Sequence, residues 1–206
     1  MDCARRYGGG VVIMTSDKVY RHPGTQNVQD ARLGGVEPYG GSKACPEVVA
    51  EVYAWSLLEP QGISLAALRA GNVVGGGDWA ANRLVPDAVR ASLSGRPLAL
   101  RRPQAVRPWQ HVLDAVQGLL LVAHHVLERR GEYSAWNVGP DLGETRTVGE
   151  IAQVAAASWG NEASGVLDGE RQFEEAEVLT IDSGQIRRQL GYHQPWPLES
   201  VVRDTM

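Results

Sequence analysis

The chain has 206 residues, of which 43% are hydrophobic and 21% are charged, a composition typical of a folded globular protein. Its net charge of −4 provides no positive field for nucleic acid, and no apolar run approaches the length of a membrane span. With two cysteines and no secretory signal, we expect a reduced cytoplasmic protein with no nucleic-acid partner and no membrane contact.

The first 75 residues predict a strand, a helix and a second strand. Apolar runs at 11–16 and 64–69 predict two buried parallel strands, and a helix is expected from about 39 to 58. The first strand ends in Ser16 and Asp17, and open α/β sheets place their sites at that end of their strands. Pro46 falls inside the expected helix, where it removes an amide donor unless it lies in the first turn.

The rest of the chain alternates helices with short strands. Helical periodicity predicts helices at 84–93, from 112 onward and at 183–190, and a strand is expected to end at 136–139. Thr147 and Glu150 form a capping-box pattern that predicts a helix over 147–159.

Cysteine, histidine and tryptophan carry little functional signal. The histidines show no metal-ligand spacing, so we assign no metal. Cys45 is expected to be a core thiol, and Trp79, Trp109 and Trp136 are expected to be packing residues.

Tyr39 and Lys43 are the most informative pair. On a helix, residues four apart share one face, so the ammonium of Lys43 would stabilise a phenolate at Tyr39. Tyr39 is therefore a candidate general base.

The sequence contains no glycine-rich turn of the kind that holds the pyrophosphate of a dinucleotide. No Gly-x-Gly-x-x-Gly follows a strand, because Gly8–Gly10 precedes one and Gly75–Gly77 comes too late in the order. We interpret both glycine runs as turns.

An ordered series of motifs carries a family resemblance: Thr15-Ser16-Asp17-Lys18-Val19-Tyr20, the Tyr39 and Lys43 pair, Leu68-Arg69-Ala70-Gly71-Asn72 followed by Gly75-Gly76-Gly77-Asp78-Trp79, Arg83-Leu84-Val85-Pro86-Asp87, and Arg107-Pro108-Trp109-Gln110-His111-Val112. From about residue 4 to 206, the chain resembles the extended short-chain dehydrogenase/reductases of the NAD-dependent epimerase/dehydratase kind. Among them it most resembles the dehydratases that act on CDP-glucose.

The resemblance implies an α/β fold, a partial Rossmann-like doubly wound parallel sheet with a small C-terminal α/β substrate domain. Residues 1–75, with 112–139 returning to them, would form the C-terminal part of the NAD-binding domain. Residues 76–111 and 140–206 would form the nucleotide-sugar-binding domain. Relative to the family, the N-terminal part of the cofactor domain, roughly a hundred residues, would be missing. The remaining sheet would then expose an apolar edge.

The resemblance also implies a lyase that uses NAD to convert CDP-glucose to its 4-keto-6-deoxy form by internal redox dehydration. Tyr39 would remove the proton of the C4 hydroxyl, and Ser16 would hydrogen-bond the same hydroxyl. Lys43 would lower the pKa of Tyr39 and hold the nicotinamide ribose. Asp17 would protonate the C6 hydroxyl, which requires a raised pKa, and Lys18 occupies the position of a C5 base.

Substrate binding is expected from four further residues. By resemblance, the nucleotide diphosphate would contact Asn72, Arg83, Leu84 and Arg107, and the arginines suit forked phosphate contacts. The family also implies a homodimer formed through the helix that carries Tyr39.

Two alternatives remain open from the sequence. One is a nucleotide-sugar epimerase, which would use Tyr39 and Lys43 but would need no acid at Asp17 and no base at Lys18. The other is a non-catalytic remnant that binds a nucleotide sugar or pairs with a partner through the bare sheet edge.

Overall fold

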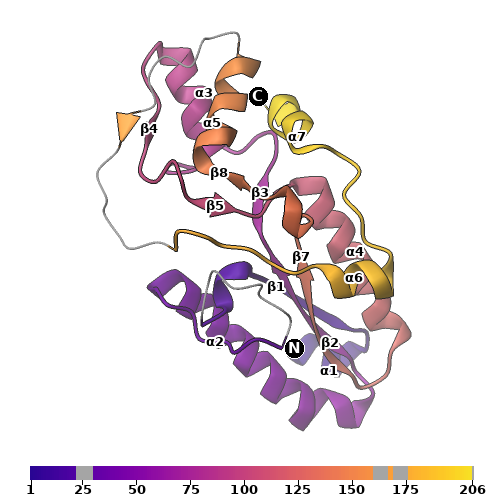
Figure 1. Cartoon of the computed structure of the whole chain (residues 1–206). Coiled ribbons are helices and arrows are strands. Elements are labelled where there is room, and N and C mark those ends of the chain that lie inside the picture. Colours follow the sequence, from indigo (N-terminus) through magenta and orange to yellow (C-terminus); the bar gives the residue numbers. More distant parts are fainter. Residues whose placement is uncertain (22–29, 160–166, 169–175, 206) are drawn as a thin grey trace.

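The computed structural model describes residues 1–21, 30–159, 167–168 and 176–205. Its main sheet has three parallel strands in the order β1-β2-β7 (Figure 1), with bounds β1 (Val11–Ser16), β2 (Leu65–Ala70) and β7 (Tyr133–Val138). All six residues of β2 are buried, whereas β1 lies at the edge and exposes Met14. The expected bare edge is therefore present in the described part of the chain, and a partial Rossmann-like sheet is confirmed.

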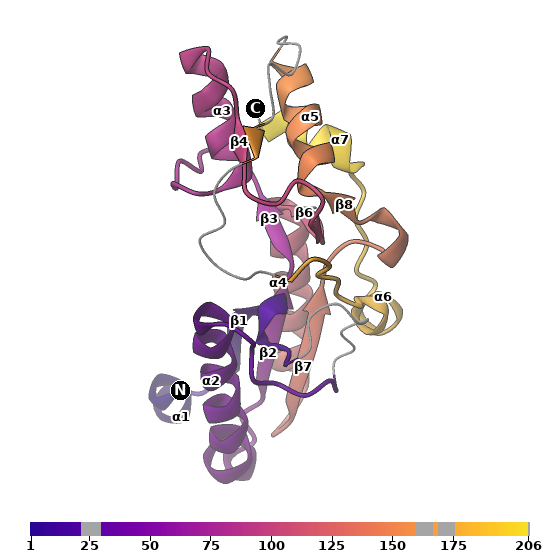
Figure 2. The same cartoon turned by 60° about the vertical axis from the view of Figure 1, so that its left-hand side comes forward.

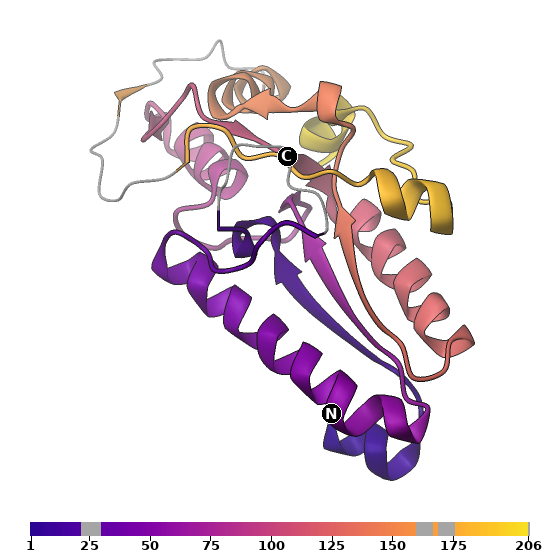
Figure 3. The same ribbon diagram turned by 60° about the horizontal axis from the view of Figure 1, so that its bottom comes forward.

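Two long helices cover opposite faces of this sheet, α2 (Pro38–Tyr53) and α4 (Val112–Glu128). Leu65 of β2 packs with Ala50 and Leu58 at the α2 side, whereas Leu68 packs with Val122 at the α4 side. Successive residues of a strand point to opposite faces, which explains this division. Figures 2 and 3 show α2 running along one side of the three strands.

Helix α2 begins where the sequence predicted and continues through its internal proline. Glu37 caps it by accepting hydrogen bonds from the backbone N–H groups of Tyr39 and Gly40, both at 3.0 Å. Pro46 lies in the middle of the helix, outside its first turn. The helix nevertheless runs to Tyr53 and continues in a π-helical turn at Ala54–Leu58, so Pro46 does not separate Tyr39 from Lys43.

A second group of helices packs beyond the carboxyl ends of the strands. Buried Val85, Ile151 and Val202 share one apolar cluster, which joins three helices. The elements of this group are α3 (Leu84–Ser94), α5 (Val148–Ser158), α7 (Leu198–Thr205), β3 (Asn72–Val74), β4 (Ala99–Leu100), β5 (Val106–Arg107), β6 (Trp109–His111), β8 (Arg146–Thr147) and β9 (Leu167–Asp168). The strands pair two by two, as β3-β6, β4-β9 and β5-β8.

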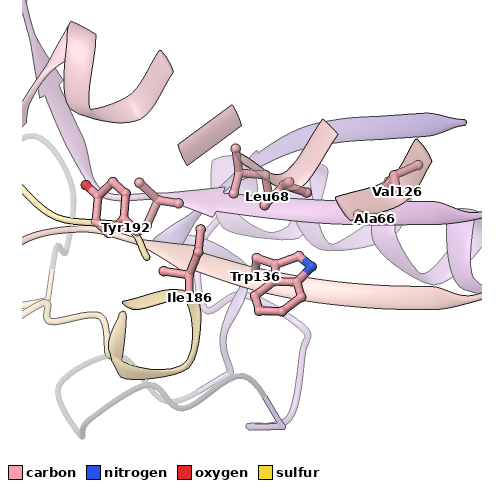
Figure 4. Packing of buried hydrophobic residues seen from close by; sticks show 8 residues of the cluster. Ala66, Leu68, Val126, Trp136, Ile186 and Tyr192 are labelled. Carbon is pink, nitrogen blue, oxygen red and sulfur yellow. The ribbon is translucent and has the colours of Figure 1, made fainter. Parts of the chain in front are cut away.

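The chain returns to the main sheet near its C-terminus. Helix α6 (Gly184–Leu190) ends at Gly191 in a left-handed conformation, and it places Ile186 and Tyr192 against Trp136 and Leu68 (Figure 4). This segment belongs in sequence to the expected substrate domain, yet its apolar side chains complete the core of the sheet.

The remaining elements include some that the sequence predicted and some that it did not. The capping box at Thr147 and Glu150 is formed, whereas helices α1 (Asp2–Tyr7) and α7 were not predicted. Between β1 and α2, Tyr20 forms an isolated bridge to Leu33, and residues 22–29 lie outside the described residues. No helix in the described ranges combines the length and hydropathy needed to cross a bilayer.

Two side-chain expectations were wrong. Cys45 is exposed, because it lies on the face of α2 that points away from the sheet. Trp79 is 62% exposed in the loop after β3, whereas Trp109 and Trp136 are buried packing residues as predicted.

Candidate active site

The carboxyl end of β1 presents three consecutive polar side chains. Ser16 pairs in register with Ala70 at the end of β2, and the chain then turns through a short 3-10 helix, Asp17–Val19. The Ser16 hydroxyl donates a hydrogen bond to Asp17 Oδ1 at 2.9 Å and accepts one from the Lys18 amide at 3.3 Å. Ser16 therefore fixes the turn and orients the Asp17 carboxyl.

Asp17 is a buried carboxyl whose pKa is raised by its surroundings. Its side chain is buried, and Oδ2 has no hydrogen-bond partner among the described residues. Burial raises the pKa of Asp17 from 3.8 to about 6, although the Ser16 hydrogen bond and the charges of Lys18 and Arg107 oppose the rise. The carboxyl is therefore about half protonated near pH 6, and a smaller fraction keeps its proton at neutral pH.

Tyr39 lies between two ammonium groups at the start of α2. The Nζ atoms of Lys43 and Lys18 lie 5.6 Å and 5.7 Å from the centre of its ring. The side chain of Tyr39 is 46% exposed, so a substrate can reach it from solvent. The structure thus brings Tyr39 and Lys43 to the same end of the sheet as Ser16, Asp17 and Lys18.

Glu37 contacts both Lys18, which follows β1, and the N-terminus of α2, which carries Tyr39. Its Oε1 lies 3.8 Å from Lys18 Nζ, and the same carboxylate caps α2. Nothing in the sequence singles out Glu37, because glutamate is not among the residues preferred at a helix N-cap, although Pro38 after it is a signal of a helix start.

The four residues expected to bind the nucleotide diphosphate lie on three different elements. Asn72 begins β3, two residues beyond the end of β2, and Arg83 and Leu84 stand at the N-terminus of α3. Arg83 is exposed, whereas Leu84 packs on the apolar cluster of the second group. Arg107 is buried in β5, and its Nη1 donates to the carbonyls of Val106 and Ala176 at 2.8 and 2.9 Å.

A separate cavity of about 230 Å³ lies between the loop after β3, helix α3 and the ends of α5 and α7. Its lining includes Gly75, Trp79, Pro86, Trp159 and Thr205. None of the sequence-predicted catalytic residues lines this cavity.

A buried polar cluster beneath the site was missed from the sequence. Glu47 of α2 and Arg69 of β2 form an ion pair with Nη2 and Oε2 2.6 Å apart, and Arg69 Nη1 donates to the Tyr20 hydroxyl at 2.9 Å. Two signals were available, since Glu47 follows Lys43 by one helical turn and Arg69 is a charge inside an otherwise apolar strand.

A comparison with protein-family models identifies the family. Residues 1–139, two thirds of the chain, match the model described as the NAD dependent epimerase/dehydratase family. The chain belongs to this family. Membership accounts for the end of β1 and the Tyr39 and Lys43 pair, which both lie inside the matched range.

Individual relatives of the family span more than this chain does. A CDP-glucose 4,6-dehydratase of Salmonella typhimurium is 39% identical over 200 residues, which cover 93% of this chain and 56% of the relative. The structure of a dTDP-glucose 4,6-dehydratase from Streptomyces venezuelae with NAD bound is 27% identical, with a TM-score of 0.82. That match covers 98% of this chain and 62% of the other.

Epimerases of the family share the fold. A UDP-glucuronic acid 4-epimerase from Bacillus cereus, in complex with NAD, has a TM-score of 0.82 at 15% identity. The match covers 99% of this chain and 62% of the epimerase. The chain thus spans less than two thirds of the length of these relatives.

The residues present fit one end of an NAD molecule. Tyr39 and Lys43 are adjacent at the open end of β1, where a hydroxyl and an ammonium can bind a ribose. The glycine-rich turn that would hold the pyrophosphate does not follow any strand of this sequence. The fit is therefore limited to the nicotinamide end.

Proposed function

We propose that this chain carries the catalytic and nucleotide-sugar-binding part of a CDP-glucose 4,6-dehydratase. The observation that carries the proposal is the buried Asp17, a carboxyl with a raised pKa that directly precedes Lys18, whose Nζ lies 5.7 Å from the centre of the Tyr39 ring. The 39% identity to a CDP-glucose 4,6-dehydratase supports the choice of substrate.

The proposed reaction moves three protons through this site. Tyr39 takes the proton of the C4 hydroxyl, while Lys43 stabilises the phenolate that forms. NAD, when bound, supplies the hydride acceptor and later the hydride donor. Asp17 would protonate the C6 hydroxyl, which leaves as water, while the proton at C5, made acidic by the C4 ketone, passes to solvent water; C5 is protonated again from solvent when the hydride is returned to C6. Ser16 holds Asp17 in place and lies within the same turn.

In this scheme Lys18 is not the base at C5 that the family resemblance implies. Its Nζ lies 3.8 Å from Glu37 Oε1 and 5.7 Å from the centre of the Tyr39 ring, and a lysine must first lose a proton before it can accept one from C5. We propose that Lys18 instead adds positive charge beside Tyr39 during oxidation at C4.

Substrate binding is proposed for the second group of elements. Residues 76–111 and 140–206 would hold the nucleotide diphosphate, with Arg83 open to solvent and Asn72 close to the end of β2. Arg107 would have to exchange its backbone carbonyl partners for phosphate oxygens.

A homodimer is proposed through α2. Its outer face and the π-helical turn that follows expose four apolar side chains between 49% and 58% exposed, Val48, Val49, Val52 and Trp55. A second copy of the chain that packs on this face would remove them from water. The cytoplasmic location expected from the sequence stays a prediction.

The test is to incubate the purified chain with CDP-glucose and NAD⁺ and to follow the loss of one water by mass spectrometry. Product that disappears in Tyr39→Phe and persists in Tyr7→Phe, an exposed tyrosine of α1, supports the proposal. Asp17→Asn should still reduce NAD⁺, seen as NADH absorbance, but should not release water.

Other outcomes identify the alternatives. An isomeric sugar without loss of water would indicate the epimerase. A folded chain that binds CDP but yields no product would indicate the binding remnant.

A further inference from the structure

A buried polar network lies directly beneath the proposed site. Glu47 is fully buried, and its Oε2 accepts hydrogen bonds from both Nε and Nη2 of Arg69, at 2.8 and 2.6 Å. Its Oε1 accepts a hydrogen bond from the hydroxyl of Thr15, the residue before Ser16. One carboxylate thus connects α2 to the ends of β1 and β2.

The network continues across the sheet to the third strand. Arg69 Nη1 donates to the hydroxyl of Tyr20, which in turn donates to Asn137 Oδ1 of β7. Asn137 Nδ2 donates at 3.1 Å to the carbonyl of Asp182, just before α6. The chain of contacts therefore spans every strand of the sheet and the turn after β1.

The position of Glu47 on α2 relates this network to catalysis. Tyr39, Lys43 and Glu47 are spaced four residues apart, so each is rotated by about 40° from the one before along the same side of the helix. The rotation and height of α2 relative to β1 decide how far Tyr39 lies from Ser16. Glu47 is a buried charged contact between α2 and these strands.

Energetic reasoning favours a role beyond stability. A buried ion pair gains little net stability over apolar residues of similar size, because both charges lose their hydration. Burial lowers the pKa of Arg69, but its hydrogen bonds to Glu47 and Tyr20 and the charge of Glu47 outweigh this and raise the pKa, so the guanidinium stays charged. Such a pair fixes geometry, since its hydrogen bonds are short and directional.

We propose that Glu47 and Arg69 are positioning residues, which hold Tyr39 and Lys43 of α2 in register with Ser16 and Asp17 of β1. This inference rests on the proposed function for its kinetic consequence. A displacement of about 1 Å at a catalytic group can cost about 100-fold in rate.

Two variants and one control test the proposal. Glu47→Gln removes the charge and keeps the shape, while the double variant Glu47→Met with Arg69→Met removes both charges and leaves neither unpaired. Glu51→Gln, one turn further along α2, is the matched control. We expect kcat to fall by about 100-fold in both variants, with KM for CDP-glucose and the Kd of CDP within about threefold of wild type.

A second readout does not need turnover. With ring-labelled tyrosine, the Tyr39 resonance, assigned through Tyr39→Phe, should shift in both Glu47 variants but not in Glu51→Gln. Tyr192, which packs on the opposite face of the sheet, should keep its resonance, since a general loosening would move both.

The outcomes separate this proposal from the proposed function. If the wild-type chain has no turnover, the activity proposal fails, and the Tyr39 resonance alone decides on positioning. A double variant that keeps the wild-type kcat, or a Tyr39 resonance that does not move, would overturn the positioning role.

Discussion

Replacing Asp17 by asparagine should stabilise the protein, and only at higher pH. The carboxyl is 3% exposed, and burial raises its pKa from 3.8 to about 6. That difference corresponds to a penalty of about 3 kcal/mol on burying the ionised form. Asparagine keeps the shape and can still accept the Ser16 hydrogen bond, but it carries no charge.

The sign follows from proton binding in the two states. The folded chain holds the Asp17 proton more tightly than the unfolded chain, so this group favours folding below about pH 4, where both states are protonated. As the pH rises from about 4 to above 6, the unfolded chain ionises first and wild-type stability is lost. Asp17→Asn should therefore match wild type near pH 4 and exceed it by about 3 kcal/mol near pH 8.

Urea unfolding followed by tryptophan fluorescence, repeated across this pH range, measures the difference. Asp78→Asn is the matched control, because Asp78 is exposed in the loop after β3 and its variant should show no gain that grows with pH. A stability difference for Asp17→Asn that is independent of pH, or that favours wild type at high pH, would refute the reasoning.

Three further predictions concern surfaces and packing. Val52→Asp should convert a dimer to a monomer in light scattering without lowering the melting temperature, because Val52 is 55% exposed on α2; an unchanged mass would contradict the α2 interface. Gly118→Ala should lower the free energy of unfolding by about 1–3 kcal/mol in urea titrations, because an added Cβ would lie 2.7 Å from Val138 Cγ2. An unchanged free energy of unfolding would show that the neighbouring side chains move to relieve this contact. Thr147→Ala should cost about 1 kcal/mol by the same assay, since its hydroxyl caps α5 and Glu150 returns the contact; Ser158→Ala, at the other end of α5, is the comparison.

The sequence predicted the elements whose signals are local. The strand before Ser16, the helix that carries Tyr39 and Lys43, and the capping box at Thr147 all depend on neighbours within one or two turns. Family resemblance then supplied roles for the residues at the end of β1. The structure brings those side chains together, and their roles stay predictions.

What the sequence did not indicate depends on contacts between distant residues. Strands of two residues such as β5, paired with β8, are too short to show a periodicity. The Glu47 and Arg69 pair joins residues 22 apart on different elements, so neither residue alone suggests the other. Cys45 was misplaced because the outer face of α2 is as apolar as the face that packs on the sheet.

The return of α6 to the first sheet has a consequence for biosynthesis. Trp136 and Leu68 are covered by Ile186 and Tyr192, more than forty residues downstream of β7 along the chain. During vectorial synthesis, β1, β2 and β7 can pair as soon as β7 has emerged, with α4 already made, but the part of the apolar face that Ile186 and Tyr192 cover stays open to water until residue 192 follows. The nascent chain therefore passes through a period in which Trp136 and Leu68 are only partly covered, and in which a chaperone can bind them.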